Sequence, residues 1–299
     1  MKIFVTGGAG FIGKHLVRSL LEKGHTVTVF DNFSNSKNDG LLAGLGAKII
    51  EGDITEKNDL TDAAINHDVI VHLAAKISVE ESIRNPSETF LINVDGTKNV
   101  LDTCKKNNIK KIVVASSAAV YGEGLPGISL TEDAETNPVS PYGESKKCME
   151  EEIRNFALKN NITYSILRFF NIFGIGQTQE YAGVITKFVK KIIENKPLEI
   201  FGDGTQTRDF VAVQDVVDAI HNAIMDGKNK TYNIASGRTT TVNELAQFMI
   251  SLSGKNLEIT HVDAKRGDIK YSQADISLAK KEIHYSPRYG LEEIRNLLR

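Results

Sequence analysis

The sequence predicts a doubly wound α/β fold, in which helices cover both faces of a parallel sheet. Short runs rich in β-branched residues alternate with longer segments of helical periodicity through the first half of the chain, as βαβ units require. The runs carry little polar alternation, which is typical of strands that are covered on both faces. Together these two observations favour a parallel sheet.

The boundaries of the elements follow from these runs. Ile12, Leu16 and Leu20 recur at helical spacing ahead of Gly24, which predicts a helix over Phe11–Lys23. We expect a first domain over Met1–Arg168, a smaller α/β cap over residues 169–299, and a return of residues 211–234 to the first domain. The predicted strands of the first domain are Lys2–Thr6, Thr26–Phe30, Ala47–Glu51, Val69–Leu73, Lys111–Ser116 and Thr163–Arg168.

Charge and composition argue against several classes of function. The 299 residues contain 36 Lys and Arg against 38 Asp and Glu, so nothing indicates a nucleic-acid surface. The apolar runs are too short for a membrane span, and a strand-like run begins at Lys2, which leaves no room for a signal peptide. Cys104 and Cys148 fit neither a disulfide framework nor a metal site. We expect both to be core thiols, no metal, and a cytoplasmic location.

A glycine-rich segment, Thr6-Gly-Gly-Ala-Gly-Phe-Ile-Gly13, joins the first strand to the first helix. Gly7 permits a sharp turn, Gly10 permits close approach of a pyrophosphate, and Gly13 permits close packing of helix and strand. The phosphates would face the free N–H groups of the helix N-terminus. Asp31 ends the second strand, where a carboxylate accepts hydrogen bonds from ribose hydroxyls and repels a 2′-phosphate. The pattern therefore predicts a Rossmann-type NAD site and disfavours NADP.

Two further strand ends are candidates for cofactor contacts. Asp53 ends the third strand and is expected to reach the adenine amino group, with Ile54 against the ring; the alternative is that Asp53 is the N-cap of a helix over Glu56–Ala64. The segment His72-Leu-Ala-Ala75 ends the fourth strand with small residues that permit close approach. His72 itself is predicted to be a core histidine.

Tyr142 and Lys146 form a candidate proton-transfer pair. A phenol is a poor base at neutral pH because its ordinary pKa is about 10, and a nearby ammonium lowers that value. If Tyr142 opens a helix, Lys146 lies one turn later on the same face. The spacing predicts a lysine-assisted tyrosine base, although two polar residues on a helix face are the ordinary interpretation when the pair stands alone.

An ordered series of motifs resembles the extended short-chain dehydrogenase/reductase family, and within it the nucleotide-sugar epimerases of the UDP-glucose 4-epimerase type. The resemblance covers nearly the whole chain. Its motifs are Thr6-Gly-Gly-Ala-Gly-Phe-Ile-Gly13, Asp31-Asn-Phe-Ser-Asn-Ser36, Gly52-Asp-Ile54, His72-Leu-Ala-Ala75, Asn93-Val-Asp-Gly-Thr97, Ser116-Ser-Ala-Ala-Val-Tyr-Gly122, Pro141-Tyr-Gly-Glu-Ser-Lys146, Arg168-Phe-Phe-Asn-Ile-Phe-Gly174 and Ile200-Phe-Gly-Asp-Gly-Thr-Gln-Thr-Arg-Asp-Phe210.

The resemblance implies NAD as the cofactor and a catalytic trio of Ser117, Tyr142 and Lys146. The Ser117 hydroxyl would bond the sugar O4 beside Tyr142, and Lys146 would also hold the nicotinamide ribose. The cofactor-binding residues expected from the motifs and the resemblance are Gly7, Gly10, Phe11, Ile12, Gly13, Asp31, Asn32, Ser34, Asn35, Ser36, Asp53, Ile54, Leu73, Ala74, Ala75, Asn93, Tyr142, Lys146 and Phe170.

The resemblance also implies a UDP-sugar substrate bound mainly by the second half of the chain. A guanidinium gives two oriented donors for a diphosphate, although Arg208 beside Asp209 is also compatible with a surface ion pair. The substrate-binding residues it implies are Ser117, Tyr142, Asn171, Gly183, Val184, Glu199, Phe201, Arg208, Lys265, Arg266 and Asp268.

The chain departs from the family pattern at three places. The arginine of the last substrate motif aligns with Lys265, and Arg266 stands one position later, so either residue is a candidate for the diphosphate contact. A lysine that binds the cofactor in some members is replaced by Ile77. Ser272 stands where strict UDP-glucose enzymes carry a tyrosine, which leads to the hypothesis that N-acetylated sugars also fit.

The motif after the catalytic serine favours epimerisation over elimination. The 4,6-dehydratases of the family carry an acidic pair at the positions of Ala118 and Ala119, and methyl groups cannot exchange protons. We therefore expect inversion at C4 of a UDP-sugar, UDP-glucose or UDP-galactose first, through a transient 4-keto sugar. The alternatives are a UDP-N-acetylglucosamine or UDP-glucuronate 4-epimerase, another NAD-dependent dehydratase or reductase, and an NAD sensor without catalysis.

The resemblance further implies a homodimer. The predicted long helices Glu88–Lys106 and Tyr142–Lys159 are candidates for its interface, because family members commonly pair there. Their apolar residues fit equally well inside one subunit; among them are Leu91, Val94, Val100 and Leu101.

Overall fold

A computed structural model describes residues 1–36, 40–177, 183–264 and 269–298. Its largest element is a seven-stranded parallel sheet with the strand order β10-β6-β5-β4-β1-β2-β3. All six strands expected for the first domain are present, and the doubly wound class is confirmed. The strands are β1 Lys2–Thr6, β2 Thr26–Asp31, β3 Lys48–Glu51, β4 Val69–His72, β5 Lys111–Ser117, β6 Thr163–Phe169 and β10 Lys230–Ile234.

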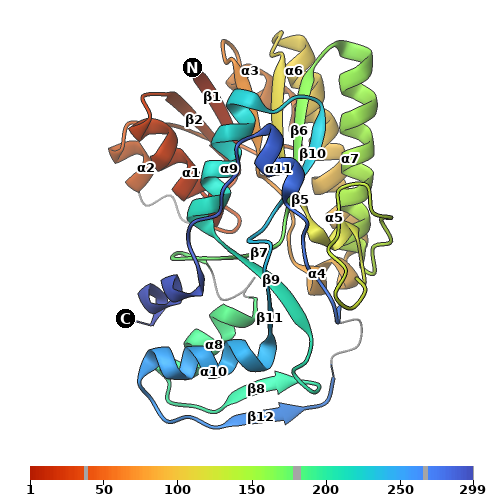
Figure 1. Ribbon diagram of the computed structural model, residues 1–299. Helices are drawn as coiled ribbons and strands as arrows, with labels where there is room; N and C mark the ends of the chain where they lie inside the picture. Colours follow the sequence, from red (N-terminus) through yellow and green to blue (C-terminus); the bar gives the residue numbers. More distant parts are fainter. Residues whose placement is uncertain (37–39, 178–182, 265–268, 299) are drawn as a thin grey trace.

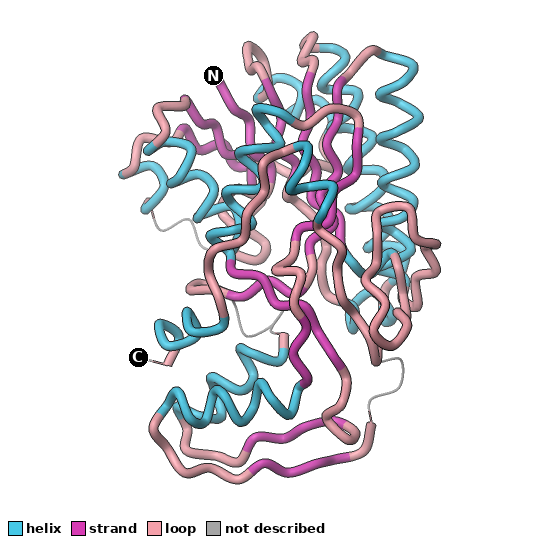
Figure 2. Tube along the Cα trace, viewed as in Figure 1, coloured by secondary structure: helices cyan, strands magenta, loops and turns pink. Residues whose placement is uncertain are grey.

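Helices cover both faces of this sheet, so that the strands form a layer between them (Figures 1 and 2). On one face α1 (Phe11–Glu22) packs beside α9 (Val213–Asp226), and their apolar residues share a core with β1 and β2. On the other face lie α3 (Lys57–Ala63), α6 (Gly96–Lys106) and α7 (Pro141–Asn160), which close a second core. Short helices α2 (Leu41–Gly44), α4 (Val79–Arg84) and α11 (Ser277–Glu282) complete this region.

The expected helix over Glu88–Lys106 is helical but not uniform. It consists of α5 (Pro86–Phe90), a π-helical turn over Leu91–Asp95, and α6. π-Turns widen a helix by one residue and commonly occur at functional sites. Here the turn contains Asn93, whose side chain is buried.

The two cysteines differ in environment. Cys104 on α6 is fully buried, as expected, and burial raises the pKa of its thiol to about 12. The expectation for Cys148 is wrong, because this residue is half-buried and its Sγ contacts the Glu144 side chain at 3.9 Å, one turn earlier on α7. α7 packs against the sheet through Met149 and Ile153, which are buried in the second core.

Residues 211–234 contribute to both parts of the molecule. The end of β9 (Thr207–Ala212) leads into α9 and then β10, which pairs with β6 in the main sheet. The division at Arg168 into two domains stays a prediction. The structure shows that β10, an edge strand of the main sheet, comes from the part of the sequence after Arg168.

The cap is built from two small sheets and two helices. A three-stranded sheet joins β7 (Asn171–Phe173), β9 and β11 (Thr239–Thr241), and a two-stranded sheet joins β8 (Leu198–Phe201) to β12 (Ile259–Val262). Helices α8 (Val184–Ile193) and α10 (Val242–Ser253) enclose a third apolar core with them, beside a short 3₁₀ segment over Leu291–Leu297. Figure 1 shows the cap beyond the carboxyl ends of the main strands.

Within the described ranges, no helix has the length and apolar character needed to span a bilayer. The same part of the chain contains no cluster of three or more His, Cys, Asp or Glu side chains that could hold a metal ion.

Candidate active site

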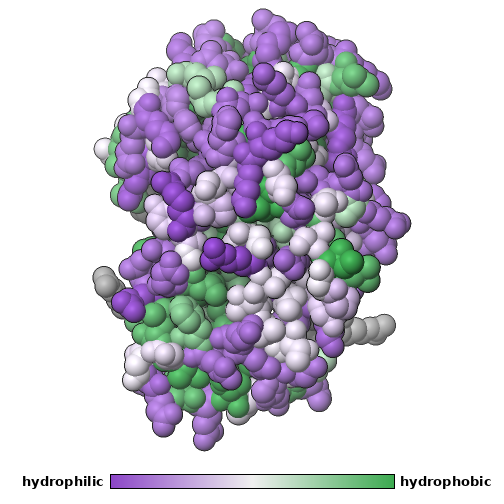
Figure 3. All heavy atoms as spheres, viewed as in Figure 1, coloured by the Kyte–Doolittle hydropathy of each residue, from purple (hydrophilic) through white to green (hydrophobic). Residues whose placement is uncertain are grey.

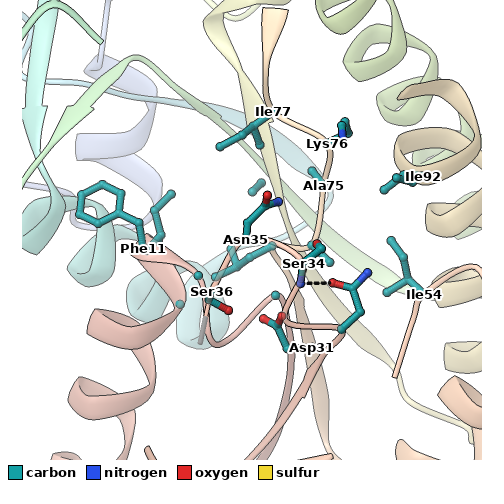
Figure 4. A pocket seen from close by; sticks show the side chains of 18 of the residues that line it. Phe11, Asp31, Ser34, Asn35, Ser36, Ile54, Ala75, Lys76, Ile77 and Ile92 are labelled. Carbon is teal, nitrogen blue, oxygen red and sulfur yellow. Dashed lines mark hydrogen bonds between the residues drawn. The ribbon is translucent and has the colours of Figure 1, made fainter. Parts of the chain in front are cut away.

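A cavity of about 680 Å³ lies at the carboxyl ends of the main strands. It opens where the strand order reverses between β1 and β4, which is where open parallel sheets bind ligands. Figure 4 shows Asp31 and Ser34 between Phe11 on one side and Ile54 on the other. The lining therefore combines polar groups from the loop after β2 with apolar walls from neighbouring loops.

The glycine-rich loop has the shape that a pyrophosphate cradle requires. A Cβ on Gly13 would lie 2.4 Å from the Gly7 carbonyl oxygen, so helix α1 can pack against the loop only with glycine at that position. Gly7 has a φ of +69°, and a Cβ there would meet the Ala74 backbone nitrogen at 2.6 Å. α1 has no side-chain N-cap, so the N–H groups of its first turn remain available to an anion.

Asp31 lies at the place expected for a ribose acceptor. Its Oδ2 accepts a hydrogen bond from the Ala9 N–H at 2.9 Å, and its Oδ1 accepts one from the Phe33 N–H at 2.9 Å. A carboxylate has about four lone-pair positions, so two remain for hydroxyl donors. Burial raises the pKa of Asp31, while these N–H groups and Lys14 oppose that rise. The glycine loop, the N–H groups of the first turn of α1 and the Asp31 carboxylate together fit a dinucleotide.

Asp53 lines the same cavity and does not cap a helix. The N-cap of α3 is Glu56, so the alternative interpretation of Asp53 is wrong. Its carboxylate accepts hydrogen bonds from the Asn32 Nδ2 at 2.6 Å and from the N–H and Oγ1 of Thr55 at 2.8 and 2.7 Å. These bonds fix the turn after β3, and the contact of Asp53 with adenine stays a prediction.

His72 is a core histidine, as expected. It is 2% exposed and its ring bridges Thr6 Oγ1, 2.7 Å from Nδ1, and Thr97 Oγ1, 3.0 Å from Nε2. Burial lowers its pKa to about 3, with Lys146 contributing in the same direction. The ring is therefore neutral at physiological pH and stabilises the junction of β1, β4 and α6.

Nearly all residues expected to bind the cofactor line this cavity. The exception is Asn93, which holds the wall in place: its Oδ1 accepts from the Lys76 N–H at 2.8 Å, and its Nδ2 donates to the Lys76 carbonyl at 3.0 Å. Lys76 and Ile77 both face the cavity, and the Lys76 ammonium lies 3.2 Å from a carboxylate oxygen of Glu81. Some family members carry a cofactor-binding lysine at position 77. This chain has Ile77 there, and the charged side chain in this part of the cavity wall is that of Lys76, one position earlier.

Ser117, Tyr142 and Lys146 all line this cavity. Ser117 ends β5, and Tyr142 and Lys146 lie on the first two turns of α7, as the spacing predicts. The helix begins at Pro141, with Ser140 as its N-cap: the Ser140 Oγ accepts from the Gly143 N–H at 3.1 Å. The three side chains expected to act together therefore come from two adjoining elements.

The structure corrects the expected electrostatics of Tyr142. Loss of water around its hydroxyl raises the pKa of this half-buried phenol, and a hydrogen bond with Ser117 opposes the rise. The expected lowering by Lys146 is not found. The Lys146 ammonium, 3% exposed, donates instead to the Ala115 carbonyl at 3.0 Å, and burial lowers its pKa to about 8. A positive charge near both groups, such as that of an oxidised nicotinamide, would favour the phenolate.

Several residues that the sequence analysis missed hold this site together. The Tyr142 N–H donates to the Ser82 Oγ at 3.1 Å, and the Ser145 Oγ accepts from the Asn93 Nδ2 at 2.9 Å. A Cβ on Gly143 would lie 2.6 Å from the Ala119 carbonyl oxygen, so glycine lets α7 approach the turn after Ser117. Gly143 and Ser145 belong to the quoted Pro141–Lys146 motif and could have been found there, whereas Ser82 lies outside every quoted motif.

The substrate residues expected in the cap are spread over its elements. Asn171 opens β7 and donates to the Asp209 carbonyl at 3.1 Å, and Gly183 is the N-cap of α8, which begins at Val184. Phe201 ends β8 and is 45% exposed. Lys265, Arg266 and Asp268 lie outside the described residues.

Two charged candidates in the cap already have protein partners. Glu199 forms an ion pair with Lys191 at 2.9 Å on the outer surface. The Arg208 Nη1 donates to the Thr207 carbonyl at 2.9 Å. The alternative interpretation, an ion pair between Arg208 and Asp209, is wrong, because the Asp209 carboxylate turns inward to Ser236 and Gly237. The contact of Arg208 with a diphosphate stays a prediction.

Comparison with known proteins agrees with this geometry. The sequence profile of the NAD dependent epimerase/dehydratase family matches residues 3–235. A Methanocaldococcus jannaschii relative, named provisionally as a UDP-glucose 4-epimerase, is 39% identical over 298 residues, or 97% of this chain and 95% of its own.

Two solved structures have the same fold throughout. UDP-glucose 4-epimerase from Thermotoga maritima, with UDP-glucose, is 34% identical with a TM-score of 0.95, covering 100% of this chain and 97% of its own. UDP-N-acetylglucosamine 4-epimerase from Methanobrevibacter ruminantium, in complex with UDP-N-acetylmuramic acid, is 34% identical with a TM-score of 0.94, covering 99% and 96%.

This chain belongs to the NAD-dependent epimerase/dehydratase family. The expected resemblance to nucleotide-sugar epimerases, the enzymatic nature of the protein and the use of NAD are thereby confirmed.

Proposed function

We propose that the protein inverts C4 of a UDP-hexose, interconverting UDP-glucose and UDP-galactose without net consumption of coenzyme. The observation that carries the proposal is that Ser117, Tyr142 and Lys146 together line the dinucleotide cavity, with Tyr142 hydrogen-bonded to Ser117. The turn that follows Ser117 contains Ala118 and Ala119. Methyl groups there cannot serve as the acid and base of an elimination, which leaves inversion as the simplest outcome.

Each of the three side chains has a defined task in this reaction. Tyr142, as phenolate, takes the proton of the sugar 4-hydroxyl and later returns it. Ser117 shares a hydrogen bond with the same oxygen, and we assign Lys146 to the nicotinamide ribose, as the family resemblance implies. NAD, held by the glycine loop and Asp31, would supply the hydride acceptor for the oxidation at C4 and the hydride donor for the return to the opposite face of the ketone. Atoms and electrons balance, because one hydride and one proton leave and the same two return.

The cap supplies the anchor that lets the sugar turn between the two hydride transfers. We assign the diphosphate to Arg208, because a guanidinium offers paired donors to phosphate oxygens. We assign the uracil to the neighbourhood of Phe201 and the start of α8 at Gly183. Lys265 and Arg266 remain the two candidates for the second phosphate contact.

A second candidate substrate is a UDP-N-acetylhexosamine. Ser272 is 8% exposed, and its side chain is far smaller than a tyrosine. The Methanobrevibacter ruminantium relative is named as an enzyme for such a sugar. Ser272→Tyr should lower kcat/KM for UDP-N-acetylglucosamine at least tenfold and leave UDP-glucose within about threefold, a difference that one pocket contact supplies. Equal kcat/KM ratios before and after the substitution would contradict this assignment.

The experiment that tests the function is NMR of the purified protein with a panel of UDP- and TDP-sugars and no added coenzyme. Appearance of the C4-inverted sugar supports the proposal. Release of NADH into solution would indicate a net dehydrogenase, and loss of the C6 hydroxyl would indicate a dehydratase. Binding of NAD with no turnover of any sugar would favour an NAD sensor.

We also infer a homodimer formed through α6 and α7. Most of the apolar residues named for this interface are covered within the subunit, since Val94, Val100 and Leu101 are 7%, 0% and 1% exposed. Leu91 is 50% exposed on the π-turn and is the residue left to contact a partner. Light scattering should give twice the monomer mass, and Leu91→Arg should reduce it to that of one chain.

A further inference from the structure

A buried carboxylate adjoins the catalytic lysine and takes no part in the chemistry described above. Glu150 lies on α7 one turn after Lys146 and two turns after Tyr142, and it is 1% exposed. In Figure 1 this helix runs beside the strands of the main sheet. A carboxylate removed from water costs free energy unless it is paired and hydrogen-bonded.

Glu150 is paired on all sides. Arg168 on β6 donates to it from Nε at 2.9 Å and from Nη2 at 2.8 Å, a two-pronged contact. The Ser116 hydroxyl on β5 donates to its Oε1 at 2.6 Å, and the Arg154 guanidinium donates to its Oε2. Burial alone would raise the pKa of Glu150, but Arg168, Ser116 and Arg154 together lower it, so the group is ionised.

These contacts fasten α7 to the end of β5 immediately before the catalytic serine. Lys146 bonds the Ala115 carbonyl and Glu150 bonds the Ser116 hydroxyl, at 3.0 and 2.6 Å. Ser117 is the next residue along the strand. The distance between the Ser117 hydroxyl on β5 and the Tyr142 phenol on α7 therefore depends on this pair of side-chain bonds.

The charge of Glu150 also acts on Lys146. Burial lowers the pKa of Lys146 to about 8, and the negative charge of Glu150 opposes that fall. The other ionisable groups facing Lys146 are Tyr142 on its own helix and His72 on β4, and the buried ring of His72 is neutral, with a pKa of about 3. The Arg168 and Arg154 guanidinium groups form ion pairs with the Glu150 carboxylate.

We propose that Glu150 is a positioning residue of the epimerase reaction, which holds β5 against α7 and keeps the Lys146 side chain cationic. The proposal rests on the proposed function, because its main readout is turnover of a UDP-sugar. Glu150 is not among the residues that line the cavity. It acts through Ser116 on the position of Ser117 and through its charge on Lys146.

The test compares Glu150→Gln with Glu151→Gln, the same substitution one residue later on the exposed side of α7. For Glu150→Gln we expect kcat to fall at least tenfold and the alkaline limb of the kcat–pH profile to move down by about one pH unit. KM for the UDP-sugar and the NAD content should stay within about twofold of wild type. Glu151→Gln should match wild type in all of these.

Two further variants keep the test decisive if Glu150→Gln fails to fold, since it leaves Arg168 buried without its counter-ion. Ser116→Ala keeps the ion pair and should lower kcat about threefold to tenfold without moving the alkaline limb. Glu150→Asp keeps the charge and should leave the limb in place while kcat falls. An unmoved limb in folded Glu150→Gln, or wild-type kcat in Ser116→Ala, overturns the proposal.

The outcomes separate this inference from the proposed function. A wild-type protein that turns over no sugar in the panel contradicts the function. An active wild type whose Glu150 and Ser116 variants behave as Glu151→Gln contradicts the role of Glu150 alone.

Discussion

The NAD-binding region and the cap are assembled by different means. In the first region much of the cavity wall directly follows the strands of one sheet, as the glycine loop follows β1 and Asp31 ends β2. In the cap, β9 pairs with β7 and β11, which places position 208 beside 240 and 210 beside 171. Short motifs therefore define the cofactor side, whereas contacts between distant segments define the cap.

The two regions also differ in the hydropathy of their surfaces. On the face drawn in Figure 3 the main domain is largely hydrophilic, whereas apolar residues gather on the cap. Among the described residues, the core of the cap has fewer buried apolar side chains than either core of the main sheet. Phe201 and Val262, on the two paired strands of the cap, are 45% and 39% exposed. The cap therefore covers fewer of its apolar side chains within the subunit than the main sheet does.

Tyr142→Phe should give the largest effect. It removes the proton acceptor and leaves the helix intact, so kcat should fall about 10³-fold or more. NAD should remain bound, because the rest of the cavity wall is unchanged. Sugar turnover by NMR and the NAD content of denatured protein measure the two properties. Loss of both to the same degree would show that the tyrosine serves binding.

Gly13→Ala tests the cradle of the NAD-binding region. The new Cβ would meet the Gly7 carbonyl oxygen at 2.4 Å, and such overpacking costs about 3 kcal/mol or more in unfolding free energy. NAD binding should be lost with it. Gly44→Ala is the matched control, since a Cβ there has no neighbour within 4 Å, and its unfolding midpoint in urea should equal or exceed that of wild type.

Asp209 tests the cap through pH. This carboxylate is 0% exposed and accepts hydrogen bonds from the N–H and Oγ of Ser236 at 2.8 and 2.7 Å and from the Gly237 N–H at 3.0 Å. Burial raises its pKa from 3.8 to about 6, against these hydrogen bonds. The folded state then holds the proton more tightly than the unfolded chain, so stability falls as pH rises from about 4 to about 6.

The expected size of that fall is about 3 kcal/mol. Asp209→Asn cannot titrate, so the difference in unfolding free energy between wild type and variant should change by this amount between pH 3.5 and 7. Urea unfolding at several pH values gives the difference directly. Parallel profiles for the two proteins would mean that the pKa of Asp209 is the same in the folded and the unfolded state.

Arg208→Gln should give the smallest effect and should be confined to the cap. Loss of the paired donors should raise KM for the UDP-sugar about tenfold to a hundredfold, with NAD content unchanged. Calorimetric titration with UDP measures the same contact without turnover. If NAD content falls in parallel with UDP affinity, the two regions are not separable in the way the comparison implies.

Much of the cofactor side was predictable from local pattern. Strand bounds, the glycine loop and the helix that carries Tyr142 and Lys146 follow from periodicity and spacing within a few residues. The interpretation of Asp53 as an N-cap and the prediction that Cys148 lies in the core were wrong. Each depends on where a helix begins or on which side of a helix one residue lies. Sequence patterns locate helix ends only to within one or two residues.

What the sequence alone determined is the class of fold, the dinucleotide cradle and the residues of the proton-transfer pair. Only the tertiary structure decided that Asn93 supports Lys76, that Glu150 joins Ser116 to Arg168, and that Tyr142 has a raised pKa. The physical reason is range. Turn geometry and helix spacing depend on neighbouring residues, whereas burial and charge depend on groups from several strands that the folded sheet brings together.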